Sequence, residues 1–211
     1  MPADRIHLIR HGEVHNPGGV LYGRLPEFRL SERGHQMAEL AAKDLLEQER
    51  KIGAIYASPL LRTRESAGHV QQAFSLTPTP DERLIEPFNI FEGRKLSAGH
   101  ILIRPHLYFH LRKPSQPSWG EPFESIAARM LEAMEDAWQN TQVGDAVLVS
   151  HQLPIVTVHR KLAGMKLSHN PKQRRCALSS ITSFERRGDG FVEVDYRDPA
   201  AKLGAIDRGA V

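Results

Sequence analysis

Two arginines and two histidines each follow a short apolar run that is long enough for one buried strand: Arg10, His11, Arg62 and His151. Guanidinium groups are permanently charged, and their planar fork of donors fits phosphate oxygens. A neutral imidazole has a lone pair that can attack phosphorus. Because no dense cluster of carboxylates accompanies these four side chains, the set describes a pocket for a dianion.

A phosphohistidine mechanism is the chemistry that such a set could perform. His11 would attack the phosphoryl group, and the N–P bond so formed would then be broken by water. The guanidinium groups could supply the charge stabilisation that Mg²⁺ supplies in other phosphoryl-transfer enzymes, so we expect no metal and no other cofactor. The departing oxygen also needs a proton, which a carboxylic acid or a third histidine could give.

The strands that must position these side chains are predicted from apolar runs. Residues 5–10, 52–58 and 145–150 each predict a buried strand, and two segments around "RGDG" (187–190) predict a closing antiparallel hairpin. In parallel sheets, sites gather beyond the carboxyl ends of the strands. If the first three strands are neighbours, the two imidazoles and two guanidiniums therefore converge at one edge of the sheet.

Helical patterns alternate with these strands. Ser31 is expected to cap one helix, and Ser58 is expected to cap the next, with Pro59 as its first residue. Residues 122–138 predict an amphipathic helix, and a last helix is expected to end near Gly164. This alternation predicts an α/β fold, a three-layer α/β/α sandwich around a mainly parallel sheet.

Length and composition suit one globular domain, which we expect to span residues 1–211. The 28 lysines and arginines outnumber the 25 aspartates and glutamates, and the net charge of +3 suits an anionic substrate. No apolar run is long enough to cross a membrane and the N-terminus has no apolar signal region, so we expect a cytoplasmic protein without a membrane partner. The single cysteine, Cys176, excludes an internal disulfide. The oligomeric state stays open.

Six stretches of the sequence occur in the order typical of one known family: "LIRHGEVHN" (8–16), "YGRLPEFRLSERG" (22–34), "ASPLLRTRESA" (57–67), "LIEPFNIFEG" (84–93), "WGEPFESIAARM" (119–130) and "VLVSHQLPI" (147–155). The first resembles the L-x-R-H-G-E signature of the histidine phosphatase superfamily, branch 1. The similarity extends from about residue 5 to about residue 195. The resemblance implies a phosphoglycerate mutase-like fold for nearly the whole chain.

The resemblance also implies roles for individual residues. His11 matches the phosphorylated nucleophile, and Glu86 matches the proton donor. Asn16 matches a phosphate-contacting asparagine, although it stands one residue nearer to the nucleophile than in the commonest pattern. The implied phosphate-binding groups are the side chains of Arg10, Asn16, Arg62 and His151 and the backbone N–H of Gly23 or Gln152.

Two other carboxylic acids compete with Glu86 for the role of proton donor. The stretch around Glu86 is one residue shorter than the family pattern, with Phe91 where tryptophan is usual, which makes Glu92 a second candidate. Glu13 is a third, although its place in the signature favours a supporting role at the rim. We expect Glu86, because it directly follows the apolar pair 84–85 that would anchor it.

These observations predict a phosphomonoester hydrolase that acts through a phosphohistidine on a small anionic phosphate ester. A phosphoglycerate mutase would use the same residues, but the extra basic, lid-forming segments of cofactor-dependent mutases find no match here. Only "HLYFH" (106–110) suggests a metal site, and only "HNPKQRRC" (169–176) suggests nucleic-acid binding, so neither partner is expected. The Pro-rich, aromatic and basic segment 94–122 predicts a lid or specificity insertion.

Overall fold

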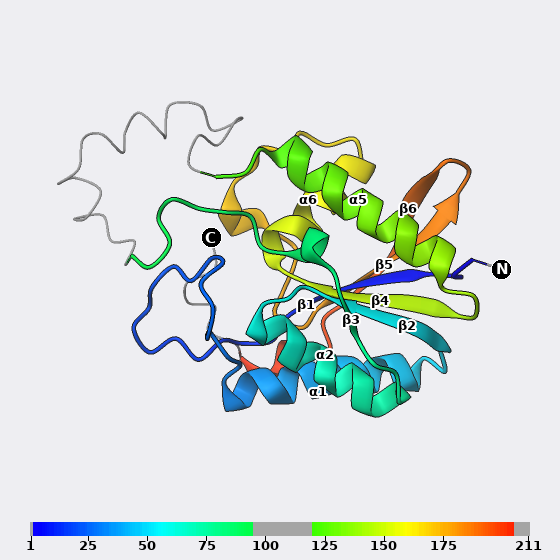
Figure 1. The fold of residues 1–211 in the computed structure, drawn as a ribbon, viewed down its shortest axis with the longest axis horizontal. Helices are drawn as coiled ribbons and strands as arrows, with labels where there is room; N and C mark the ends of the chain where they lie inside the picture. Colours follow the sequence, from blue (N-terminus) through cyan, green and yellow to red (C-terminus); the bar gives the residue numbers. More distant parts are fainter. Residues whose placement is uncertain (1, 95–119, 205–211) are drawn as a thin grey trace.

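The computed structural model describes residues 2–94 and 120–204, and a six-stranded sheet lies at its centre (Figure 1). The strand order is β3-β2-β4-β1-β5-β6. Strands β1 to β4 pair in parallel, whereas β5 runs antiparallel to β1 and β6 antiparallel to β5. The strands are β1 (Ile6–Arg10), β2 (Ile52–Ala57), β3 (Thr79–Pro80), β4 (Asp145–Ser150), β5 (Ile181–Arg187) and β6 (Gly190–Arg197).

Helices cover both faces of this sheet, with α1 and α2 on one face and α5 and α6 on the other (Figure 1). The α-helices of the described residues are α1 (Glu32–Glu47), α2 (Leu61–Phe74), α5 (Phe123–Asn140) and α6 (Gln152–Leu162). Short 3₁₀ turns lie at η1 (Glu82–Leu84), η2 (Pro171–Gln173) and η3 (Ala201–Leu203). The predicted three-layer α/β/α sandwich around a mainly parallel sheet is therefore confirmed.

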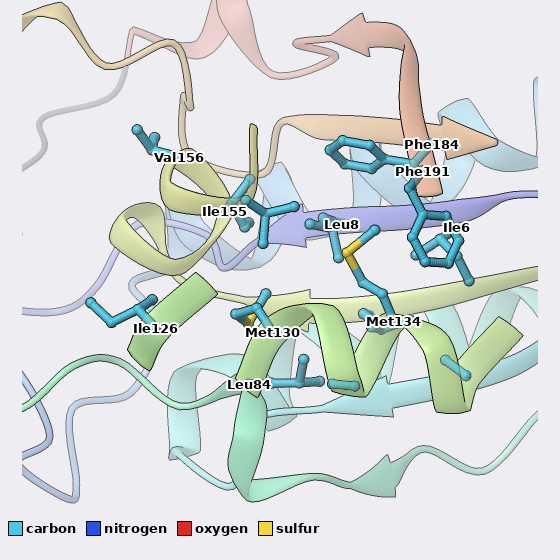
Figure 2. Close-up of a cluster of buried hydrophobic side chains, with 14 of the residues drawn as sticks. Ile6, Leu8, Leu84, Ile126, Met130, Met134, Ile155, Val156, Phe184 and Phe191 are labelled. Atoms are coloured by element: carbon cyan, nitrogen blue, oxygen red, sulfur yellow. The ribbon is translucent and has the colours of Figure 1, made fainter. Parts of the chain in front are cut away.

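Two apolar clusters hold the layers together, because successive side chains of a strand point to opposite faces of the sheet. Ile6 and Leu8 of β1 pack with Met130 and Met134 of α5 in the larger cluster (Figure 2). Ile9, one position further along β1, belongs to the cluster on the α1 and α2 side. The central strand is thus buried on both faces, which explains its nearly continuous apolar sequence.

The parallel pairing brings the ends of three strands to one edge of the sheet. Arg10 at the end of β1 pairs in register with Ser150 at the end of β4. Ala57 at the end of β2 pairs with Val149 of β4. The residues that follow β1, β2 and β4 therefore leave the sheet side by side, as the sequence predicts.

The helix starts confirm one predicted cap and correct another. Ser31 caps α1, since its hydroxyl oxygen accepts a hydrogen bond from the Gly34 N–H at 2.9 Å. The prediction that Ser58 caps the next helix and that Pro59 begins it is wrong, because α2 starts at Leu61. The physical reason is that the Ser58 hydroxyl is used elsewhere, in a hydrogen bond to a buried histidine.

Two other predicted features fall wholly or largely outside the described residues. Most of the predicted insertion, 94–122, lies there, and so does the whole of "HLYFH" at 106–110. Among the helices that the structure does describe, none has the length and apolar character needed to cross a membrane.

Candidate active site

His11 lies directly after β1, and its imidazole is buried. Its Nδ1 is 2.8 Å from the backbone carbonyl oxygen of Gly12. Because a carbonyl oxygen only accepts, Nδ1 carries the hydrogen and Nε2 keeps the lone pair. Burial, followed by the charges of Arg62 and Arg10, holds the pKa of His11 well below its usual range. The ring is therefore neutral near pH 7 and has a nucleophilic nitrogen.

Gly12 allows the loop after β1 to lie directly against the first helix. A Cβ atom at this position would come within 2.3 Å of the carbonyl oxygen of Gly34. The Gly12 N–H donates to the Ser66 hydroxyl at 3.1 Å, and this hydroxyl in turn donates to the carbonyl oxygen of Arg62 at 2.8 Å. These contacts fix the His11 backbone to α1 and to α2 together.

Two guanidinium groups lie beside His11, and Arg10 and Arg62 are each only 1% exposed. Arg10 Nη1 donates to the carbonyl oxygen of Cys176, and Arg62 Nη2 donates to that of Gly23, both at 2.7 Å. The Arg62 guanidinium also lies 4.8 Å from the ring centroid of Tyr22. Within the described part of the chain, Nε and Nη1 of Arg62 are buried and have no hydrogen-bond acceptor. Since burying such donors without acceptors is unfavourable, the site suits an anion.

His151 joins this group from the junction of β4 and α6. Arg62 Nη2 lies 3.2 Å from its Nδ1, and the Ser58 hydroxyl lies 2.8 Å from its Nε2. Because arginine can only donate, Nδ1 accepts, and Nε2 carries the hydrogen that it donates to Ser58. Burial and then the charges of Arg62 and His11 hold the pKa of His151 well below its usual range. The His11 and His151 ring centroids are 5.2 Å apart.

Glu86 supplies a carboxyl group beside the His151 imidazole. Its Oε2 lies 3.6 Å from Nδ1 of His151. Burial raises its pKa to about 6, and the charges of Arg62 and Arg174 oppose this rise. Glu86 can therefore hold a proton near neutral pH and release it within the pocket.

The backbone around Glu86 is fixed by two hydrogen bonds from other parts of the chain. The Ser150 hydroxyl at the end of β4 donates to the carbonyl oxygen of Leu84 at 2.7 Å, and the Leu84 side chain is fully buried. Arg24 Nε donates to the carbonyl oxygen of Glu86 itself at 2.6 Å. The anchoring that the sequence assigns to the apolar pair before Glu86 is thus present for Leu84.

The two rival acids occupy different places. Glu92 accepts a hydrogen bond from the Asn89 N–H at 3.1 Å, and its side chain lies against Gly23. Glu13 accepts a hydrogen bond from the Ser31 hydroxyl at 2.7 Å, at the start of α1. Glu13 thus helps to fix the start of that helix. Glu86 is the acid for which the structure records a contact with His151.

Asn16 and Gly23 lie in the loop that follows β1. Asn16 is buried, and its amide donates to the Val20 carbonyl oxygen at 2.8 Å and accepts from the Val20 N–H at 3.2 Å. Gly23 has a φ of +37°, and its carbonyl oxygen accepts from Arg62. These contacts organise the loop, and the phosphate contacts implied for both residues stay predictions.

Gln152 is the first residue of α6, where backbone N–H groups lack partners within the helix and favour anions. Its side-chain Nε2 donates to the carbonyl oxygen of Cys176 at 3.4 Å, and its Oε1 accepts from Arg174 Nη1 at 3.1 Å. The helix start thus faces the same edge as His151, its N-cap. The contact of the Gln152 N–H with phosphate stays a prediction.

Ser58, Tyr22 and Arg174 are not among the site residues predicted from the sequence, but the structure places them near those residues. The sequence predicts a helix cap at Ser58, but its position directly after a strand is the signal that it shares with His11 and His151. The described residues contain no group of three or more His, Cys, Asp or Glu side chains arranged to hold a metal ion.

Together the fold and the site define a class: a three-layer α/β protein with a buried cluster of arginines and histidines at the carboxyl edge of its sheet. Residues 6–199 match the family model of the histidine phosphatase superfamily (branch 1). The chain belongs to this family, as the motifs of the sequence predict.

Three proteins of similar sequence show which activities occur among the relatives of this chain. An uncharacterized protein of Mycobacterium tuberculosis is 45% identical over 203 residues, which cover 95% of this chain and all of the relative. Phosphoserine phosphatase 1 of Hydrogenobacter thermophilus is 28% identical over 169 residues, 78% of each chain. The 2,3-bisphosphoglycerate-dependent phosphoglycerate mutase of Thermoplasma acidophilum is 30% identical over 152 residues, 70% of each chain. These relatives support a phosphatase or mutase type of activity.

Solved structures support the fold. The YhfR protein of Bacillus stearothermophilus superposes with a TM-score of 0.76 and 26% identity, covering 90% of this chain and 94% of the other. A phosphoserine phosphatase of Entamoeba histolytica superposes with a TM-score of 0.74 and 22% identity, covering 91% and 95%. The phosphoglycerate mutase-like fold expected from the motifs is therefore confirmed.

Proposed function

We propose that this protein is a metal-independent phosphomonoester hydrolase that acts through a phosphohistidine on a small anionic phosphate ester. The observation that carries the proposal is the tautomer of the His11 imidazole. Its Nδ1 hydrogen is bound to the Gly12 carbonyl oxygen, so the lone pair of Nε2 is free to react next to buried guanidinium groups. An attacking lone pair beside a cationic pocket is what transfer of a phosphoryl group to nitrogen needs.

The first step transfers the phosphoryl group to the protein. His11 Nε2 attacks phosphorus, the bond from phosphorus to the ester oxygen breaks, and the protonated Glu86 gives its proton to that oxygen. Arg10 and Arg62 stabilise the negative charge of the phosphoryl oxygens throughout. The pKa of Glu86, about 6, allows a substantial protonated fraction near pH 6.

The second step returns the protein to its starting state. The Glu86 carboxylate accepts a proton from a water molecule, whose oxygen attacks phosphorus and breaks the N–P bond. Inorganic phosphate leaves, His11 is again neutral, and Glu86 is again protonated. The reaction thus uses one water molecule for each ester and consumes no other reagent.

A phosphoglycerate mutase is the second candidate, favoured by the relative from T. acidophilum that carries this name. A mutase would use the same pocket but protect the phosphohistidine from water and return the phosphoryl group to a hydroxyl of its substrate. Hydrolysis remains our proposal because the basic segments typical of cofactor-dependent mutases have no counterpart in the sequence.

The test compares the wild-type protein with His11→Ala on a panel of phosphomonoesters, with phosphate release as the readout. The proposal predicts release by the wild-type protein and its loss in the variant. Full activity of His11→Ala would contradict the mechanism, and so would an acid-labile phosphoenzyme formed by the variant. Isomerisation of 3-phosphoglycerate, assayed with and without 2,3-bisphosphoglycerate, would instead identify a mutase.

Four further proposals accompany this function. The partner is a small-molecule phosphate ester rather than a nucleic acid. The cytoplasmic location and the single domain over 1–211 rest on composition and on the predicted pattern of elements. The lid or specificity role of 94–122 rests on its sequence between the proton donor and the next helix.

A further inference from the structure

Glu121 lies just before α5, and its carboxylate holds two arginines at once. Both oxygens accept from Arg129 of that helix, since Oε1 lies 2.8 Å from its Nε and Oε2 lies 3.0 Å from its Nη2. Oε2 also accepts from Nη2 of Arg24, in the loop after β1, at 3.3 Å. A carboxylate that meets a guanidinium through two parallel hydrogen bonds fixes the orientation of the guanidinium as well as its position.

Each of these arginines also donates to the backbone of the segment that carries Glu86. Arg24 Nε donates to the carbonyl oxygen of Glu86 itself at 2.6 Å. Arg129 Nη1 donates to the carbonyl oxygen of Arg83, and that of Leu84 between them accepts from β4. The two guanidinium groups that Glu121 holds therefore fix both ends of this short segment.

The backbone of Glu121 lies against the residues that follow Glu86. Its N–H donates to the carbonyl oxygen of Phe88 at 3.3 Å, and the preceding Gly120 forms an antiparallel bridge with Asn89. A Cβ atom on Gly120 would come within 2.5 Å of the Phe88 carbonyl oxygen, so this close approach needs glycine. Side-chain and backbone contacts of Glu121 thus hold the chain on both sides of Glu86.

The ion pair between Glu121 and Arg129 is partly shielded from water, and both side chains are 15% exposed. A pair of similar burial joins Asp44 of α1 to Arg197 of β6, with side chains that are 17% and 19% exposed. In both places the loss of the carboxylate leaves a partly buried guanidinium without that partner. The pairs differ in the second contact of the arginine. Arg129 donates to the backbone near Glu86, whereas Arg197 donates to a carboxylate of its own strand.

The charge of Arg129 also acts on Glu86. The charged and titratable side chains that act on Glu86 from the surrounding elements are Arg10, Arg62, Arg129, His151 and Arg174. Burial raises the pKa of Glu86 to about 6, and the arginines oppose this rise. Without Glu121, the charge of Arg129 would lose its matching carboxylate and the Glu86 side chain could move toward water. Both changes favour the carboxylate form of Glu86 and so lower its pKa.

We propose that Glu121 is a positioning residue for the proton donor, and that it acts through the two arginines that it holds against the backbone around Glu86. Proton transfer needs the acid within hydrogen-bond reach of the departing oxygen, so even a small displacement of the carboxyl group is costly. This inference rests on the proposed function, because the position of Glu86 matters for the reaction only if Glu86 gives the proton.

The test uses two aryl phosphates, phenyl phosphate and 4-nitrophenyl phosphate, which differ in how much the leaving group needs a proton. The nitro group stabilises the departing phenolate, so the second ester depends less on the acid. A displaced acid therefore slows phenyl phosphate selectively, whereas partial unfolding slows both esters equally. The kcat/KM values, which report the step in which the phenolate leaves, are compared for the wild-type protein, Glu121→Ala, Arg24→Ala, the control Asp44→Ala and the reference Glu86→Gln.

We expect Glu121→Ala to lose about 10- to 100-fold on phenyl phosphate and less than about threefold on 4-nitrophenyl phosphate. Arg24→Ala removes the direct donor to the Glu86 carbonyl oxygen and should show the same selectivity. Asp44→Ala should leave the ratio of the two values unchanged. If Glu86→Gln is selective but Glu121→Ala slows both esters equally or slows neither, the positioning role is overturned and the proposed function stands.

A titration that needs no turnover separates this inference from the proposed function. ¹³C NMR of labelled glutamate carboxyl groups follows Glu86, whose signal is identified by its absence in Glu86→Gln. If the wild-type protein hydrolyses neither ester, or if Glu86→Gln slows both equally, the proposed role of Glu86 fails and the titration still decides about Glu121. We expect a lowered pKa of Glu86 in Glu121→Ala and an unchanged one in Asp44→Ala. An unchanged pKa of Glu86 in Glu121→Ala contradicts the inference, and circular dichroism shows whether the variant is folded.

The same titration of Arg24→Ala distinguishes position from charge. This variant removes a cation, and the loss of a nearby positive charge can only raise the pKa of a carboxyl group. A lowered pKa of Glu86 in Arg24→Ala therefore reports that the carboxyl group has moved toward water, as the positioning role predicts. A raised or unchanged pKa would assign the effect of Glu121 to charge alone and overturn that role.

Discussion

Strand β1 carries one buried histidine and is followed by another, and the two have opposite surroundings. His7 lies near the start of the strand, with its Nε2 3.0 Å from Asp145 Oδ2 and its Nδ1 2.8 Å from the Ser183 hydroxyl. His11 lies just past the other end, and the charges that act most strongly on it are those of guanidinium groups. Both rings are buried, so burial alone does not distinguish them.

Charge balance does distinguish them. Asp145 also accepts hydrogen bonds from Arg50 Nε and Nη2, at 2.6 and 2.7 Å, so the network at His7 contains both a cation and an anion. Burial alone would raise the pKa of Asp145, but the hydrogen bonds from His7 and Arg50 outweigh it and lower the pKa to about 2. In the His11 pocket, by contrast, donors of Arg62 lack acceptors among the described residues. A balanced network indicates a structural role, and a pocket with such donors indicates a ligand.

The largest effect is expected from the acid of the His11 pocket. Glu86→Gln should lower kcat/KM about 1000-fold, because an amide can neither give nor take the proton. Its free energy of unfolding should stay equal or rise, since a neutral amide is easier to bury than a carboxylate. Phosphate release and chemical denaturation measure the two quantities. Wild-type activity in this variant would show that another acid is the proton donor, and Glu92 would be tested next.

The matching change beside His7 should affect stability rather than activity. Asp145→Asn should lower the free energy of unfolding by about 3 kcal/mol or more, because it leaves the Arg50 charge near a buried amide. Its kcat/KM, measured on folded protein, should stay within about threefold of wild type. A large loss of activity at unchanged stability would show that the network at His7 is not merely structural.

The two carboxyl groups should also give opposite pH dependences of stability. The raised pKa of Glu86 means that its contribution is full below about pH 4.5 and is lost as pH rises through about 6, a change of about 2 kcal/mol. The lowered pKa of Asp145 means that its contribution is full above about pH 4 and is lost as pH falls through about 2. Denaturation across pH should show both slopes.

Each slope should disappear in its own variant. Glu86→Gln should abolish the loss between pH 4.5 and 6, and Asp145→Asn should abolish much of the loss below pH 4. The wild-type hydrolysis rate should also fall as pH rises above about 6, because the first step needs protonated Glu86. A rate that keeps rising through this range would argue against Glu86 as the acid.

The smallest effect concerns two buried serines that make the same contact. Ser58 lies 2.8 Å from His151 Nε2, and Ser183 lies 2.8 Å from His7 Nδ1. Ser58→Ala should lower kcat about tenfold, because the Nε2 hydrogen of His151 loses its acceptor and the ring no longer keeps one tautomer. Ser183→Ala should lower stability by about 1 kcal/mol and leave kcat unchanged. Equal changes of kcat and of stability in the two variants would contradict the distinction between a functional His151 and a structural His7.

The sequence predicted the fold well because apolar periodicity reports burial directly. The central strands alternate with amphipathic helices, and parallel pairing then brings Arg10 and Ser150 to one edge. The histidine phosphatase motifs located the candidate residues around that edge, and their roles there remain predictions. The family itself is confirmed.

The sequence could not predict contacts between side chains that are brought together by the path of the backbone between elements. Ser58 has the side chain of a helix cap, but α2 starts at Leu61, so its hydroxyl meets His151 instead. The network at His7 joins residues that are 138 and 176 positions apart, and no local pattern links them. Arg174 similarly belongs to a basic loop whose direction is fixed by contacts with α6.

The central claim is that His11 Nε2 receives the phosphoryl group, since the Nδ1 hydrogen is held by the Gly12 carbonyl oxygen. Rapid quenching of the enzyme with substrate, followed by mass spectrometry and ³¹P–¹⁵N correlation NMR, locates the phosphoryl group directly. We predict one acid-labile phosphoryl group on Nε2 of His11, and none in His11→Ala. A phosphoryl group on Nδ1 or on another residue, or turnover without any phosphoenzyme, would contradict the claim.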